Sequence, residues 1–426
     1  MRRRDISKLI VGSAAGAMLA SRPAAAQSCT SPGYLVDAQC HGFAAGNSAA
    51  ANAAAIAAAI TAAQSAGSQG STVQLPAGSF NVDPFSIPQY VAVRGAGMRA
   101  TVLTCASAGY FIKVGGNKSG QSKYGCGLSD LAIQITDANG HAIQLMETIG
   151  AQIARIYMEG PIVVGRSCRG VTIDGGDISS FFNHIHDVIA NHWQTGFLML
   201  SSGTTETTLN HFTNCTALGD VGGVGTASVG LRITNVQGSG AVWVGGNFEA
   251  CGKGVQLESG CKSMTFHGAR FEGNTKDVYL QGTAGATSFI ACFLDMINGI
   301  QNDANAGFNM HSFIACVNGS SQGIGSRLMG ENKITAARTT DRALVVEAYP
   351  GHTTQVAMQL QNSAGTKLFA VNALGEMDKQ AYRSGTGSPV LSVTPRFVGE
   401  EYLRTAGTVQ WFKSTGTTSS AWVALN

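Results

Sequence analysis

The chain has 426 residues, of which 28 are basic and 25 acidic, and only 12% are charged, while 44% are hydrophobic and 55 are glycine. Its nearly balanced charge gives no indication of a nucleic-acid partner, and its length can bury a long core. The many glycines suit a fold with tight corners, where the backbone needs positive φ.

The first 26 residues predict an export signal. A basic start is followed by an apolar run over residues 9–19 and by three alanines before Gln27, a small-residue cleavage site. The run is too short to span a bilayer, so we expect no membrane anchor after processing and a periplasmic or extracellular location. Arg3-Arg4 resembles a twin-arginine motif, with ordinary secretion as the alternative. The remaining chain has 23 basic and 24 acidic residues.

Residues 48–66 are almost entirely Ala and Ile, with Ile56 and Ile60 on one helical face and Gly67 after the end. This pattern predicts a helix whose apolar face covers the open end of the structure that follows.

Two short strands are predicted next, over residues 72–75 and 79–82, and the segment 91–97 follows them. Together with the helix, the run from Val73 to Val82 and the segment Val93-Arg94-Gly95-Ala96-Gly97 resemble the opening of pectate-lyase-superfamily proteins. The segment upstream, residues 37–42, departs from that family's acidic, Gly-rich pattern. The resemblance covers roughly residues 35–320 and implies a right-handed parallel β-helix, a fold that polygalacturonase-like enzymes and phage tailspikes share.

Two short patterns recur between Leu128 and Cys316 at intervals of 22 to 34 residues. One is Gly or Asp followed by apolar-x-apolar, as in residues 170–173, 196–199, 230–233, 254–257 and 277–280. The other is apolar-x-x-apolar, which becomes the literal repeat Ser-Phe-Ile-Ala-Cys at 288–292 and 312–316. Each repeat is too short for a helix and a crossover, so an all-β parallel solenoid over residues 27–330 is predicted.

The sequence changes character near Ile334. We expect a separate small β region over residues 335–426, with strand-like runs at 356–362 and 367–372. Its resemblance to the terminal segments of phage tail proteins implies a homotrimer or glycan contact. The alternative is a β cap over the last coil.

The ten cysteines of an exported chain allow disulfides. Three pairs are close enough in sequence for small loops: Cys29 with Cys40, Cys105 with Cys126, and Cys251 with Cys261. Cys292 and Cys316 share one place in consecutive coils, where they could equally be stacked buried thiols.

The third position of the apolar-x-x-apolar pattern predicts an outward polar stripe, formed by Asp130, Arg155, Asp187 and His211, with His186 beside it. Arg155 could hold the carboxylate of an acidic sugar and a histidine could take a proton, oriented by Asp187. The alternative is that these are ordinary surface residues, because the 32 residues between Ile153 and Ile185 include an insertion.

A second predicted set is Glu249, Glu272 and Asp295, which recur every 23 residues. Stacked on successive coils they would lie about 5 and 10 Å apart, near the separations of retaining and inverting glycosidases. Acids at coil corners can also simply accept backbone hydrogen bonds. Asp174 and Asp177 are a third acid pair that a turn explains equally well, and Trp243 shares a core register.

No phosphate-binding, dinucleotide, zinc or nucleophile-elbow motif is present, so neither a cofactor nor a metal is predicted. We expect an exported protein that binds an extended polysaccharide and depolymerises it, as a lyase or as a glycoside hydrolase. The alternative is a non-catalytic, tailspike-like glycan-binding or surface protein, since a fold alone does not establish chemistry.

Overall fold

The computed structural model describes residues 34–66, 70–116, 120–201, 205–219, 228–234, 240–258, 261, 263–281, 287–294, 300–303, 311–318, 323–329, 356–361, 367–372, 383–386, 388–390, 394, 401–406 and 410–425. The chain divides into two compact units, residues 1–332 and 333–426. The predicted export signal over residues 1–26, Cys29 and Asp295 lie outside the described residues.

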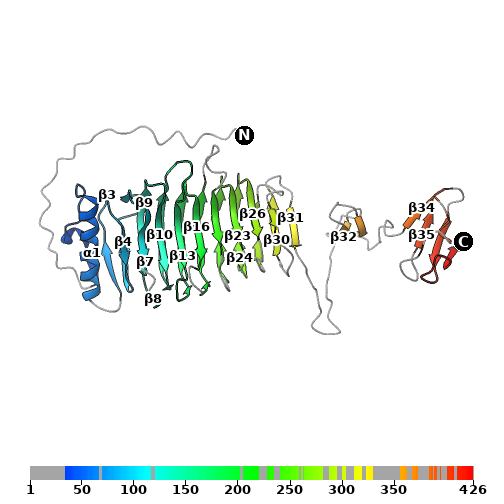
Figure 1. Cartoon of the computed structure of the whole chain (residues 1–426), viewed down its shortest axis with the longest axis horizontal. Coiled ribbons are helices and arrows are strands. Elements are labelled where there is room, and N and C mark those ends of the chain that lie inside the picture. The colour runs from blue at the N-terminus through cyan, green and yellow to red at the C-terminus, as the bar shows by residue number, and fades with distance from the viewer. Residues whose placement is uncertain are drawn as a thin grey trace. The chain divides into compact units, whose positions relative to one another are not determined.

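The first unit is a parallel β-solenoid of about 7 turns, which confirms the predicted fold class (Figure 1). The Gly-apolar-x-apolar repeat forms its second sheet, in which Val171, Phe197, Leu231 and Val255 pair in register from coil to coil. The strands of this sheet are β4 (Phe85–Ile87), β7 (Gly109–Val114), β10 (Gly140–Met146), β13 (Arg169–Asp174), β16 (Thr195–Leu200), β20 (Val229–Ile233), β23 (Lys253–Leu257), β26 (Lys276–Gln281) and β29 (Ile300–Asp303).

The largest sheet bends around a corner of the solenoid. Its strands are β1 (Leu35–Asp37), β2 (Ser71–Gln74), β3 (Gly78–Asn81), β5 (Val91–Arg94), β6 (Thr101–Cys105), β9 (Gly127–Ile135), β12 (Gln152–Glu159), β15 (His184–Asn191), β18 (His211–Thr213), β19 (Thr216–Leu218), β21 (Val242–Val244), β22 (Asn247–Glu249), β24 (Met264–His267), β25 (Arg270–Glu272), β27 (Thr287–Ile290), β28 (Phe293–Leu294), β30 (His311–Asn318) and β31 (Gly323–Met329). A short third sheet contains β8 (Lys123–Tyr124), β11 (Thr148–Ile149), β14 (Ser180–Phe181) and β17 (Thr207–Thr208).

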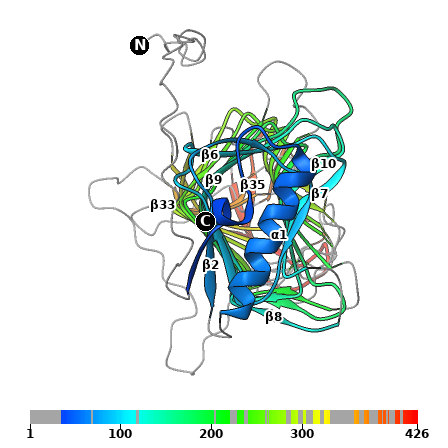
Figure 2. The same cartoon turned by 90° about the vertical axis from the view of Figure 1, so that its left-hand side faces the viewer.

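The predicted N-terminal helix is α1 (Ala49–Ser65), which follows the short 3-10 helix η2 (Ala38–His41). Ser48 caps α1, because its hydroxyl accepts a hydrogen bond from the Ala51 amide at 3.2 Å. Ile56 and Ile60 are buried, and α1 lies across the open end of the solenoid (Figure 2). The helix therefore covers the first coil, as predicted. None of the helices in the described residues is long and apolar enough to cross a bilayer.

The interior of the solenoid is filled by stacked apolar side chains. Phe266 and Phe289, on neighbouring coils, have ring centroids 4.8 Å apart and nearly parallel planes. Trp243 packs on Phe212 and Phe248 and has no exposed surface, as its core register predicted. Because large aromatic rings stack in register at this end of the solenoid, successive coils keep aromatic residues at the same position, and the sequence repeat is regular.

Two of the three disulfides that the sequence allowed are not formed. Cys105, Cys126, Cys251 and Cys261 are buried thiols that form no disulfide. Their separations in sequence do not match a full coil, so they occupy different interior positions; Cys261 Sγ, for example, lies 3.1 Å from the Ile233 carbonyl oxygen. Cys292 and Cys316, one coil apart, are also free and buried, which is the stacked-thiol alternative. Cys40 is disulfide-bonded.

In the second unit, β32 (Val356–Gln361) and β33 (Lys367–Asn372) pair as an antiparallel hairpin. A second small sheet contains β34 (Arg383–Gly385), β35 (Glu401–Arg404), β36 (Gln410–Ser414) and β37 (Trp422–Leu425). Tyr402, Phe412 and Trp422 form its core.

Candidate active site

Three residues of the predicted polar stripe occupy the same corner of successive coils. Asp130, Arg155 and Asp187 have φ values of 59°, 51° and 54°, so each adopts a left-handed backbone between its two flanking strand segments. The flanking pairs Leu128/Leu131, Ile153/Ile156 and Ile185/Val188 are in register and point inward. The insertion after Ile153 therefore does not disturb the alignment of these coils.

Asp130 connects two arginines. Its carboxylate accepts hydrogen bonds from Arg155 Nε at 2.5 Å and Nη2 at 2.8 Å, and from Arg94 Nε at 2.9 Å. The hydrogen bond from Arg155 holds the pKa of Asp130 below its ordinary value. The side chain of Arg155 remains 45% exposed, so a planar cation is held in place at the surface.

The next coil carries a histidine oriented by a carboxylate. His186 Nδ1 donates to Asp187 Oδ2 at 3.0 Å, and Asn214 Nδ2 donates to Asp187 Oδ1 at 2.7 Å. These two hydrogen bonds lower the pKa of Asp187. With Nδ1 engaged, Nε2 of His186 is the nitrogen that can accept a proton.

The prediction for His211 is wrong in register. His211 lies opposite His184, on which its ring stacks at 5.2 Å, and the corner residue of its coil is Asn214. Leu209 opens the apolar-x-x-apolar pattern that contains His211, but it lies at a different corner, before β18, and is 42% exposed, while Phe212 fills the interior. His211 therefore belongs to the flat face before the corner.

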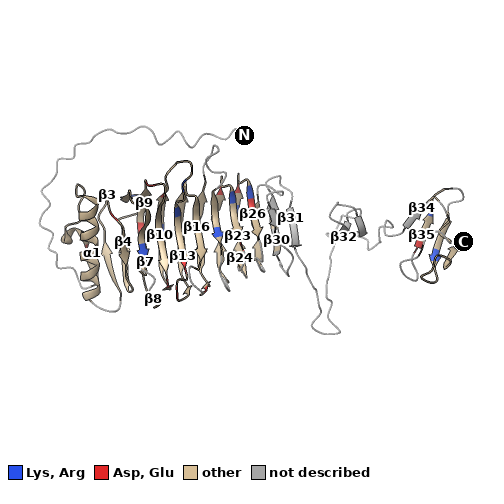
Figure 3. Cartoon of the chain, viewed as in Figure 1, with Lys and Arg blue, Asp and Glu red and all other residues tan. Residues whose placement is uncertain are grey.

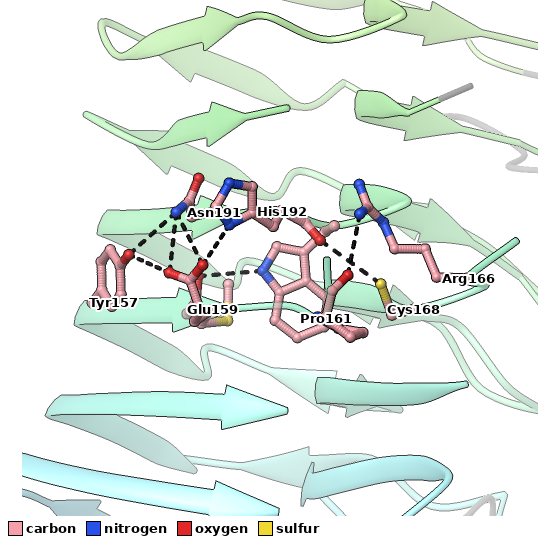
Figure 4. A network of polar contacts seen from close by, with 9 residues as sticks. Tyr157, Glu159, Pro161, Arg166, Cys168, Asn191 and His192 are labelled. Carbon is pink, nitrogen blue, oxygen red and sulfur yellow. Dashed lines mark hydrogen bonds and ion pairs between the residues drawn. The ribbon is translucent and has the colours of Figure 1, made fainter. Parts of the chain in front are cut away.

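A polar network that the sequence reading missed lies further along β12 and β15 (Figure 4). Glu159 accepts hydrogen bonds from the Tyr157 hydroxyl, from Asn191 Nδ2 at 3.0 and 3.2 Å, and from His192 Nδ1 at 2.5 Å. Burial raises the pKa of Glu159, but these hydrogen bonds outweigh it and the pKa is lowered. Burial and the hydrogen bond to Glu159 raise the pKa of Tyr157.

The second corner of the coil positions this network. His192 has φ 62°, and a side chain at the preceding corner residue, Gly160, would meet the His192 carbonyl oxygen at 2.5 Å. The indole of Trp193 is buried beneath and donates to the Met158 carbonyl at 3.3 Å. The guanidinium of Arg99 lies 4.8 Å from the centre of the Tyr157 ring.

Glu249 and Glu272 are directly opposite each other on β22 and β25. Asn247 Nδ2 donates to Glu249 at 2.9 Å, and Arg270 pairs with Glu272 at 2.8 Å. The same ladder of positions, four residues after each corner, runs from coil to coil: Gln134, Glu159, Asn191, Leu218, Glu249 and Glu272. The offset of four from each corner is the signal that would have found Glu159.

Asp174 lies in a turn, as the alternative interpretation of this residue predicted, because its Oδ1 accepts a hydrogen bond from the Gly176 amide at 3.0 Å. Among the described residues, no group of three His, Cys, Asp or Glu side chains is arranged to hold a metal ion.

No protein-family model matches the sequence, and no curated protein matches it. Three solved structures illustrate what the chain is similar to. The A-module of a mannuronan C-5 epimerase from Azotobacter vinelandii is 17% identical with a TM-score of 0.39, over 66% of this chain and 93% of that one. The pre-mature gene product 12 of bacteriophage phi29 is 14% identical with a TM-score of 0.49, over 66% and 41%. An Acinetobacter phage tailspike protein is 13% identical with a TM-score of 0.41, over 92% and 79%.

Proposed function

We propose that this protein binds an acidic polysaccharide on the outer surface of β12 and β15 and cleaves it by β-elimination. One observation carries the proposal: Arg155 lies one coil from Asp187, which holds Nδ1 of His186 at 3.0 Å. A fixed cation and an oriented imidazole base therefore lie on neighbouring coils, about 4.8 Å apart in backbone spacing. β-Elimination on a uronic acid needs these two groups close together.

In this mechanism Arg155 binds the carboxylate of the sugar and stabilises the charge that develops there when the adjacent carbon loses its proton. Nε2 of His186 accepts that proton, and the electron pair forms the new C=C bond as the glycosidic C–O bond breaks. The leaving oxygen takes a proton from water. Asp187 and Asp130 act as positioning residues, because Asp187 holds His186 in place and Asp130 holds Arg155.

The test is cleavage of a panel of acidic and neutral glycans by residues 27–426, followed by size-exclusion chromatography with ultraviolet detection. We expect acidic chains to shorten and to gain absorbance from the new double bond. Arg155→Ala and His186→Ala should each lower kcat by about 10²-fold. His211→Ala is the matched control, since it removes an imidazole of the same sheet outside the corner, and it should keep full activity. Full activity in Arg155→Ala and His186→Ala overturns this mechanism.

A second candidate, glycoside hydrolysis, is supported by the register of Glu249 and Glu272. Two carboxylates about 5 Å apart match the separation of a retaining pair. Glycan chains that shorten without gaining absorbance would favour this reaction over elimination, provided that the shortening activity is lost in Glu249→Gln and Glu272→Gln. Asp295 belongs to the same proposal and is tested by Asp295→Asn.

If glycans of the panel bind to the protein and are not shortened, the non-catalytic glycan-binding alternative is favoured.

The proposed setting is outside the cytoplasm, after removal of residues 1–26, and the proposed assembly is a homotrimer formed through residues 335–426. Fractionation of the full-length chain and sedimentation of a chain truncated after residue 332 test these two points separately from the chemistry.

A further inference from the structure

The second sheet of the solenoid carries basic side chains that the proposed cleavage site does not use. They lie on β7, β13, β20, β23 and β26 (Figure 3). Glu258, which follows β23, pairs with Arg232 at 2.7 Å. The basic residues are Lys113, Arg169, Arg232, Lys253 and Lys276. All five are partly exposed.

Two of these cations each contact a tyrosine on the outer surface. Lys253 Nζ lies 4.4 Å from the centre of the Tyr279 ring, and Arg169 Nη1 donates to the Tyr110 hydroxyl at 3.1 Å. Lys253 also donates to Gln256 Oε1 at 2.8 Å, and the Tyr110 ring packs edge-on against His141. Each contact fixes a cation beside an aromatic ring, the pairing that suits an acidic sugar.

Arg169 and Lys253 occupy one ladder of the sheet. The positions between them are Thr195 and Val229, which pair in register from coil to coil. Three coil steps separate the two cations, about 14 Å along the solenoid axis. Lys276 continues the ladder directly opposite Lys253. Two like charges in adjacent register repel one another, and an anionic ligand would relieve that repulsion.

We propose that this face of the second sheet is a separate binding surface for a linear anionic polysaccharide that runs along the solenoid axis. The acidic groups of the polymer meet Arg169, Lys253 and Lys276, and its sugar rings lie against Tyr110 and Tyr279. Lys253 and Lys276 lie one coil apart, about 5 Å, and Arg169 lies three coils from Lys253, about 14 Å, so the cations are sparser than the phosphates of duplex DNA at about 1.7 Å per charge. The spacing favours a polymer with one charge per sugar over a nucleic acid. The inference concerns binding and stands whether or not the corner site cleaves its substrate.

The test is equilibrium binding to the His186→Ala protein, whose proposed cleavage site is silenced so that the polymer stays intact. Polygalacturonate and alginate are the anionic probes, dextran is the neutral probe, and a single-stranded oligonucleotide is the nucleic-acid probe. Arg169→Gln and Lys276→Gln should each weaken binding to an anionic probe by about fivefold, the effect of about 1 kcal/mol per exposed ion pair. The double variant should lose about 25-fold, since the two sites are far apart.

Lys123→Gln, which removes a cation from the third sheet of the same solenoid, is the matched control and should bind as the parent does. Unchanged thermal unfolding of each variant shows that the fold is retained. The proposal is overturned if the double variant binds within twofold of the parent, if neither anionic probe binds, or if dextran binds equally well. Preference for the oligonucleotide also overturns it and identifies a nucleic-acid surface. The two proposals are tested by different variants: His186→Ala should lose cleavage and keep binding, whereas Arg169→Gln and Lys276→Gln should weaken binding.

Discussion

Asp130 and Arg155, on successive coils of the solenoid, are joined by two hydrogen bonds, from Nε at 2.5 Å and from Nη2 at 2.8 Å. Both residues adopt a left-handed backbone at the same corner. The bidentate pair fixes the plane of the guanidinium, which a single contact would leave free to rotate. Arg94 supports the same carboxylate from the preceding coil, so three coils contribute to the position of one exposed cation.

Asp130→Asn should destabilise the solenoid and release Arg155. The amide keeps the shape of the side chain but loses the charge that pairs with both arginines. We expect the free energy of unfolding to fall by about 1 kcal/mol, because both arginines are well exposed. Urea unfolding followed by circular dichroism measures this change. Arg404→Gln, in the second unit, is a control that should leave unfolding of the solenoid unchanged.

The same pair predicts how stability depends on pH. The pKa of Asp130 is lower in the folded protein than in the unfolded chain. Its contribution is therefore fully present above the unfolded pKa, near 4, and is lost as the pH falls through the lower folded pKa. The difference in thermal midpoint between the wild type and Asp130→Asn should be constant at neutral pH and shrink below about pH 4. A difference that grows on acidification would contradict this assignment.

The network around Glu159 predicts a shift in the titration of Tyr157. The pKa of Tyr157 is raised by burial and by its hydrogen bond to Glu159. In Glu159→Gln the carboxylate is neutral, so the phenolate is less disfavoured and the pKa of Tyr157 should fall toward its ordinary value while burial keeps part of the shift. Ultraviolet difference spectra across alkaline pH, with Tyr157→Phe to identify the signal, measure this. An unchanged titration would mean that Glu159 has no influence on the phenol.

Stacked rings in the core predict a large stability loss on truncation. Phe266 and Phe289 are fully buried and parallel. Phe266→Ala should lower the free energy of unfolding by about 3–5 kcal/mol, from lost burial and the remaining cavity. Phe293→Ala is the contrasting variant, because that ring is partly exposed beneath Arg270, and it should cost clearly less. Equal losses in the two variants would argue against a ring stack as the core of this end.

Periodicity predicted the solenoid well because the inward position of every coil faces the same apolar interior and therefore requires the same kind of residue. Phe266 and Phe289 recur one coil apart because each ring packs on an equivalent neighbour. The site was harder to predict, since outward residues have no such constraint. His211 was assigned to the wrong register because Leu209 is apolar, as an inward residue would be, although its side chain is exposed. Glu159 was missed because its neighbours in the ladder, Asn191 and Leu218, are not acidic.

Corner residues predict a final pair of opposite stability changes. Ala291 and Gly268 occupy the corner of successive coils, with φ values of 52° and 64°. An alanine in this left-handed region is strained by about 1 kcal/mol, whereas a glycine is not, so Ala291→Gly should stabilise the solenoid by up to about that amount. Gly268→Ala should cost a similar amount from strain alone, because no atom lies within 4 Å of a side chain added there. Urea unfolding of both variants measures the two changes. Shifts of the same sign would contradict the shared corner geometry, on which the alignment of Arg155 with Asp187 also depends.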